Sequence, residues 1–129
     1  MLSELSVPEQ DVIGKLLEGE HPALRSLRDQ LATLCVVSRE MTGTGFMTSF
    51  VRPDVPSAAD DTTYRIGDVD AEIDGLQHGA GFILYIQGGF LDALEGYSFD
   101  EPWPSEIERF TLTFNDPTGR KLPFSDETA

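Results

Sequence analysis

The chain has 129 residues, of which 9 are basic and 23 acidic, giving a net charge of −14. This length predicts one domain, residues 1–129, whose hydrophobic core needs no metal to hold it together. The excess negative charge repels phosphate, which argues against free nucleic acid and anionic membranes as partners. A single cysteine, Cys35, excludes an internal disulfide and a multi-cysteine metal site.

The N-terminal stretch from Met1 to Glu9 lacks the basic region and the apolar run of an export signal. Nowhere does an apolar run approach the ~20 residues that a membrane-spanning helix needs. Together with the single cysteine, these observations predict a cytoplasmic protein.

Two short helices are predicted near the N-terminus, at about residues 8–18 and 22–31. Ser6, with Glu9 three residues later, has the pattern of a capping box, and His21 before a proline marks the second helix start. Apolar residues recur at helical spacing in both segments. The helices are therefore expected to contribute several leucines to the core: Leu16, Leu24, Leu27 and Leu31.

After Leu31 the chain is rich in β-branched and aromatic residues separated by glycines, which predicts a run of strands. The strands are expected at residues 34–37, 46–51, 64–73, 82–86, 90–95 and 110–114. A polar loop is expected at residues 53–61. The run 82–86 is apolar at every position, which predicts a central strand covered on both faces. Asp74-Gly75 and Gly88-Gly89 are two-residue hairpin signals.

Helices followed by strands indicate an α+β fold with two N-terminal helices packed on a mostly antiparallel sheet. The helices are expected to cover one face of this sheet. The other face is only partly polar, so part of it is a candidate binding or dimer surface.

Four carboxylates fall at every second position of one expected strand: Asp68, Asp70, Glu72 and Asp74. This period would place all four on one face, ~6.5–7 Å apart, which is too wide for one ion but suits a row of Lys or Arg side chains. A solvated strand face and a calcium loop are the alternatives. Gly81 stands where a calcium loop needs its bidentate Glu, so no metal is expected.

A two-residue turn at residues 88–89 would place Glu95 opposite Phe82, on an otherwise apolar face. An unpaired buried carboxylate is costly, so Glu95 is expected to pair with Arg25, Arg28 or the N–H groups of a helix end, or to lie at the open end of the sheet. A proton-handling role is the alternative.

Motifs typical of enzymes are absent from the sequence, including G-x-S-x-G, H-E-x-x-H and the phosphate-binding loop. His21 and His78 have no recognised metal or catalytic-triad spacing. The sequence therefore predicts a protein that is not an enzyme and uses no cofactor.

The most distinctive segment is Leu94-Glu95-Gly96-Tyr97-Ser98-Phe99-Asp100-Glu101-Pro102-Trp103-Pro104. Tyr97 and Trp103 are of the types that dominate interface hot spots, and Glu101 lies just before the Trp. The alternative is that Trp103 closes the core.

With its flanking strands, at about residues 81–114, this segment resembles the LExYxxxEPWP-type ending of small uncharacterised bacterial proteins. Some of those proteins resemble immunity proteins encoded beside polymorphic toxins. The resemblance implies an α+β cytoplasmic protein without a cofactor.

The leading hypothesis is a non-enzymatic, acidic interaction domain, such as an immunity-type inhibitor of a basic protein. Its expected partner-binding residues are Asp68, Asp70, Glu72, Asp74, Tyr97, Glu101 and Trp103. Two alternatives are a small-ligand-binding or weakly enzymatic domain and a homodimeric structural protein. A large pocket with convergent polar groups would favour the ligand-binding alternative, and a flat acidic surface would favour the inhibitor.

Overall fold

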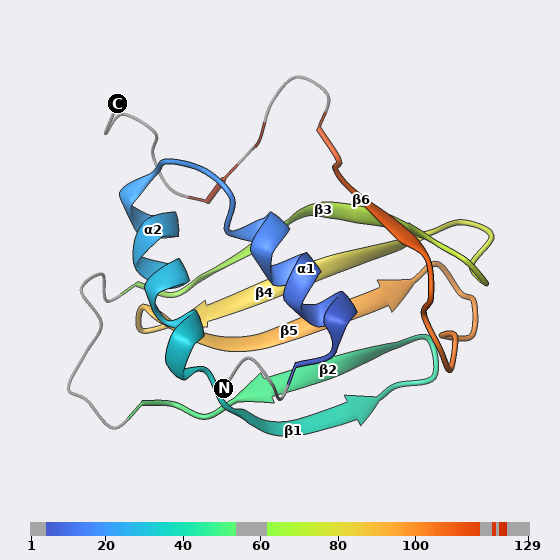
Figure 1. Ribbon diagram of the computed structural model, residues 1–129, viewed down its shortest axis with the longest axis horizontal. Coiled ribbons are helices and arrows are strands. Elements are labelled where there is room, and N and C mark those ends of the chain that lie inside the picture. The colour runs from blue at the N-terminus through green and yellow to red at the C-terminus, as the bar shows by residue number, and fades with distance from the viewer. Residues whose placement is uncertain (1–4, 54–61, 117–119, 121, 124–129) are drawn as a thin grey trace.

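A computed structural model describes residues 5–53, 62–116, 120 and 122–123, and within them it shows two α-helices and a six-stranded antiparallel sheet (Figure 1). This arrangement confirms the predicted α+β class. The expected polar loop at 53–61 lies, from residue 54 onward, outside the described residues. The elements are α1 (Val7–Leu16), α2 (Pro22–Asp29), a 3-10 turn η2 (Leu31–Thr33), β1 (Val36–Met41), β2 (Gly45–Phe50), β3 (Tyr64–Ile73), β4 (Ala80–Gln87), β5 (Phe90–Ser98) and β6 (Phe110–Phe114).

Both helices begin where the sequence predicts, because side chains satisfy their first N–H groups. Ser6 Oγ accepts the Glu9 N–H at 3.2 Å, and Glu9 Oε1 accepts the Ser6 N–H at 2.8 Å, which completes the capping box. His21 Nδ1 accepts the Ala23 N–H at 3.0 Å at the start of α2.

The strands lie in the order β1-β2-β5-β4-β3-β6, with every neighbouring pair antiparallel. As predicted, β4 is central. Both helices lie on the same side of the sheet (Figure 1). Between them and the sheet is the core, where side chains of the helices meet those of the strands: Val12, Ile13, Leu16, Leu24, Leu27, Ile66, Leu84, Ile86 and Leu94.

Gly88 and Gly89 form the predicted tight turn, and their φ angles of 59° and 82° lie in the region that favours glycine. Asp74 and Gly75 do form a tight turn, since the Leu76 N–H bonds to the Ile73 carbonyl at 3.0 Å and Gly75 has a φ of 101°. The hairpin is nevertheless longer than two residues, because β4 begins only at Ala80. The longer connection leaves room for the segment after β5 to pack against it, as described below.

The first strand also begins later than predicted, at Val36 rather than residue 34. The 3-10 turn Leu31–Thr33 carries the chain away from α2 before pairing starts. Cys35 therefore precedes the strand, although its carbonyl already accepts the Val51 N–H at 2.8 Å.

Candidate functional site

One face of the sheet packs against α1 and α2. Neither of these helices lies on the opposite face of the sheet (Figure 1). Strand registers identify which side chains point to this second side, since directly paired residues share a face. We call this side of the sheet the uncovered face. Among the described residues, the strand-paired residues on this face that have large or charged side chains are Glu40, Met47, Arg65, Asp70, Glu72, Ile83, Tyr85, Glu95 and Tyr97. Four of these are carboxylates and one is basic, so the face is acidic.

Glu95 lies on the uncovered face, which corrects the expectation that it opposes Phe82 among apolar side chains. The register does begin as predicted, with Ile86 opposite Leu91, but a bulge follows and Glu95 pairs with Ile83. The extra residue reverses the side to which every later side chain points. The predicted ion pair with Arg25 or Arg28 is therefore not needed.

Tyr85, on the neighbouring strand, is the hydrogen-bond partner of Glu95. Tyr85 Oη donates to Glu95 Oε1 at 2.6 Å. This hydrogen bond, followed by partial burial, raises the pKa of Tyr85 above its ordinary value of 10.0. The phenol thus stays neutral, and Met47 and Ile83 flank Glu95 in the neighbouring strands.

Tyr97 also lies on the uncovered face, near the C-terminal end of β5, and is paired with Gly81. A Cβ atom on Gly81 would clash with the Tyr97 ring, so the glycine allows the ring to lie across β4. The Phe99 ring packs edge-on against Tyr97, with centroids 5.8 Å apart. Burial and then the negative charges of Asp70 and Glu95 raise the pKa of Tyr97.

Beside Tyr97 the face is hollowed into a groove with a volume of about 870 Å³. Asp70 and Glu72 of β3 lie in it opposite Thr113 and Thr111 of β6, and the half-exposed Phe99 lies at its rim. Asp74 lines the same groove, so these three carboxylates are the part of the predicted acidic row that the structure places together.

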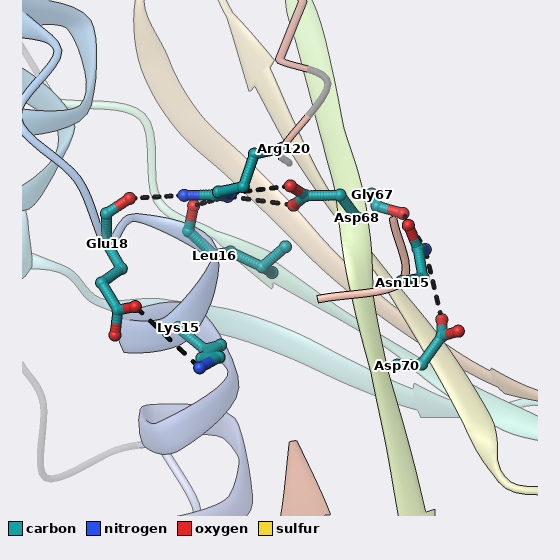
Figure 2. Close-up of polar contacts among 8 residues, drawn as sticks. All are labelled: Lys15, Leu16, Glu18, Gly67, Asp68, Asp70, Asn115 and Arg120. Carbon is teal, nitrogen blue, oxygen red and sulfur yellow. Dashed lines mark hydrogen bonds and ion pairs between the residues drawn. The ribbon is translucent and has the colours of Figure 1, made fainter. Parts of the chain in front are cut away.

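Asp68 does not belong to this row, contrary to the predicted alternation. The β3–β4 register shifts between Ile66 and Val69, which turns Asp68 toward the helices. There its two carboxylate oxygens accept hydrogen bonds from Arg120 at 2.7 and 2.9 Å (Figure 2). Arg120 also donates to the carbonyls of Leu16 and Glu18 at the end of α1. The buried Asp68 therefore holds the helix to the sheet.

Asp74 follows β3 instead of lying within it, and it forms an exposed ion pair with Arg109 at 3.0 Å. Glu101 accepts the backbone N–H groups of Gln77 and His78 at 2.7 and 2.8 Å, which lowers its pKa. It thereby ties the segment after β5 to the β3–β4 connection. Asp74 lines the same groove as Asp70 and Glu72, but its charge is paired with that of Arg109.

Trp103 lies on the helix side of the sheet. Its ring packs edge-on against Phe46 and Phe82, at centroid distances of 5.5 and 6.4 Å. The alternative interpretation, in which Trp103 helps to close the core, is the one that the structure favours.

Sequence reasoning did not foresee the second role of Glu9. Only 3% of this residue is exposed, and its carboxylate accepts Arg39 Nη2 at 2.6 Å and Thr48 Oγ1 at 2.5 Å. Burial opposes its ionisation, but hydrogen bonds from Arg39, Thr48 and Ser6 outweigh burial and hold the pKa of Glu9 below 4.5. A capping glutamate is usually exposed, so the pattern gave no signal of this cluster.

Comparison with known proteins yields no match to a family model, to a curated protein or to a solved structure. Within the described part of the chain, no helix is long and apolar enough to cross a membrane. The same residues contain no group of three His, Cys, Asp or Glu side chains arranged to hold a metal ion.

Proposed function

We propose that this chain is a non-enzymatic, acidic interaction domain that binds a basic protein through its uncovered face. The observation that carries the proposal is the composition of that face. The face combines four carboxylates and one basic residue, Arg65, with apolar and aromatic side chains that neither helix covers.

Charge complementarity favours a basic protein over a second copy of this chain. Each molecule carries a net charge of −14, and two uncovered faces brought together would place Asp70, Glu72 and Glu95 against like charges. The same repulsion argues against nucleic acid as the partner. A homodimer would have to use another surface.

The arrangement of the face suits an inhibitor that reaches its partner quickly and then holds it. Exposed carboxylates steer a basic partner during approach. Phe99, which lines the groove, and the Tyr97 ring packed against it offer aromatic area for contact once the partner is docked. With the resemblance of residues 81–114, these features support an immunity-type inhibitor acting in the bacterial cytoplasm.

The test compares two double variants with the same change in net charge. Asp70→Lys with Glu72→Lys alters the groove, whereas Asp11→Lys with Asp29→Lys alters exposed residues of the two helices. The probe is a peptide of ten arginines, titrated by NMR and by stopped-flow mixing at low and high salt. We expect the groove variant to lower the association rate by about tenfold and the helix variant by much less.

In the unmodified protein, the peptide is also expected to shift the resonances of Tyr85 and Tyr97. The proposal fails if both double variants lose the same amount of binding, since the net charge alone would then attract the peptide. It also fails if the shifted resonances belong to the helices.

A further inference from the structure

A second hollow, independent of the uncovered face, lies on the helix side of the sheet. It has a volume of about 310 Å³ and lies between the first turns of α1, strand β1 and the segment that carries Trp103. We call it the Trp103 pocket. An apolar protein cavity of about 150 Å³ already holds a benzene ring, so this pocket has room for a small ring compound.

The walls of the Trp103 pocket are mainly apolar. Phe46 and Phe82 form part of them, and their rings meet each other at 6.5 Å and the Trp103 ring edge-on. Val12 of α1 and Ile107 also belong to the apolar lining. Such walls offer ring faces and edges to a flat aromatic ligand.

The charged residues of the pocket neutralise each other. Glu9 accepts hydrogen bonds from Ser6 N, Thr48 Oγ1 and both Nε and Nη2 of Arg39. Four donors occupy its two oxygens, so the carboxylate has little capacity to accept a ligand amine. Glu9 and Arg39 are the charged residues that line the pocket in the described part of the chain, and they already balance each other. A ligand with its own charge would therefore enter at a high desolvation cost.

We infer that the Trp103 pocket binds small, neutral, single-ring aromatic compounds that carry a hydroxyl group. The ring would lie among Phe46, Phe82 and Trp103, and the hydroxyl would face the rim, where Ser6 and Ser105 contribute the remaining polar side chains. The inference does not rest on the proposed protein partner.

Trp103 is the only tryptophan in the chain, so its fluorescence reports on this pocket without interference. Three probes of similar size test the ligand's charge: benzyl alcohol, benzoate and benzylamine. We expect benzyl alcohol to shift the Trp103 emission with saturation at about millimolar concentration, as befits a ligand of few atoms. Benzoate and benzylamine should bind at least about tenfold more weakly.

Two variants locate the binding. Ile107→Phe fills the pocket and should abolish the saturable shift, whereas Ile83→Phe makes the same change on the uncovered face and should leave the shift intact. If Ile107→Phe does not fold, nuclear Overhauser contacts between benzyl alcohol and the Trp103 ring in the unmodified protein serve instead. The inference is overturned if emission changes without saturation, if the three probes bind equally, or if those contacts are absent.

Discussion

The two faces of the sheet are built from the same strands but are stabilised in different ways. On the helix side, Leu84 and Leu94 are fully buried, and the charged groups Glu9 and Asp68 are held by several hydrogen bonds each. On the uncovered face, Ile83 is only half-buried, and charged groups lie beside apolar ones. The helix side therefore contributes more to the stability of the fold, whereas the uncovered face is partly exposed to water.

The largest expected effect comes from neighbouring residues of β4 that point to opposite faces. Leu84→Ala should lower the free energy of unfolding by about 3–4 kcal/mol, because it leaves a cavity in the core. Ile83→Ala should lower it by about 1 kcal/mol, since its side chain is already partly in water. Urea unfolding of both variants measures the difference. Equal losses would show that the uncovered face is packed as tightly as the core.

Glu9→Gln should lower the free energy of unfolding by about 2–3 kcal/mol, because Arg39 loses its buried counter-charge. The folded protein holds the pKa of Glu9 below 4.5, so its stabilisation is complete above that pH. It is lost as the pH falls from there through the lower folded pKa. Thermal unfolding of both proteins should therefore show the gap between them narrowing in acid. A gap that widens in acid would contradict this assignment.

Asp68→Asn and Asp70→Asn separate the two faces within a single strand. Asp68→Asn should cost about 2 kcal/mol, because it weakens the bidentate contact through which Arg120 holds the end of α1 (Figure 2). Asp70→Asn should change stability by less than about 0.5 kcal/mol. Hydrogen exchange should quicken at the end of α1 in the first variant only. The same exchange rate in both variants would show that the contact between Asp68 and Arg120 does not hold the end of α1.

Local features of the fold were predictable from the sequence because they depend on nearby residues. The capping box at Ser6, the His21 cap and the glycine turn at residues 88–89 each join groups within a few positions. The strands β3 and β6 were also found, because they alternate apolar and polar residues over a sufficient length.

The composition of the candidate site was harder to predict, because it depends on two β-bulges. One bulge, between Ile66 and Val69, removes Asp68 from the acidic row, and another, near Asp92, brings Glu95 to the uncovered face. Bulges follow from how whole strands fit together, and alternation within one strand does not reveal them. The all-apolar run of β4 likewise predicted a second covering layer, although neither helix covers that side.

Tyr85→Phe is expected to have a smaller effect than Leu84→Ala, Glu9→Gln or Asp68→Asn, and it tests the uncovered face directly. It removes the hydrogen bond to Glu95, which should cost less than about 1 kcal/mol because the pair is only partly buried. The bond raises the pKa of Tyr85, so its stabilisation is complete below pH 10.0 and is lost as the pH rises through the higher folded pKa. Ultraviolet titration of the phenols should lose a late-ionising group in the variant. If Tyr85→Phe instead destabilised the protein as much as Leu84→Ala, this face would be part of the core, and a partner would find no exposed carboxylate there to bind.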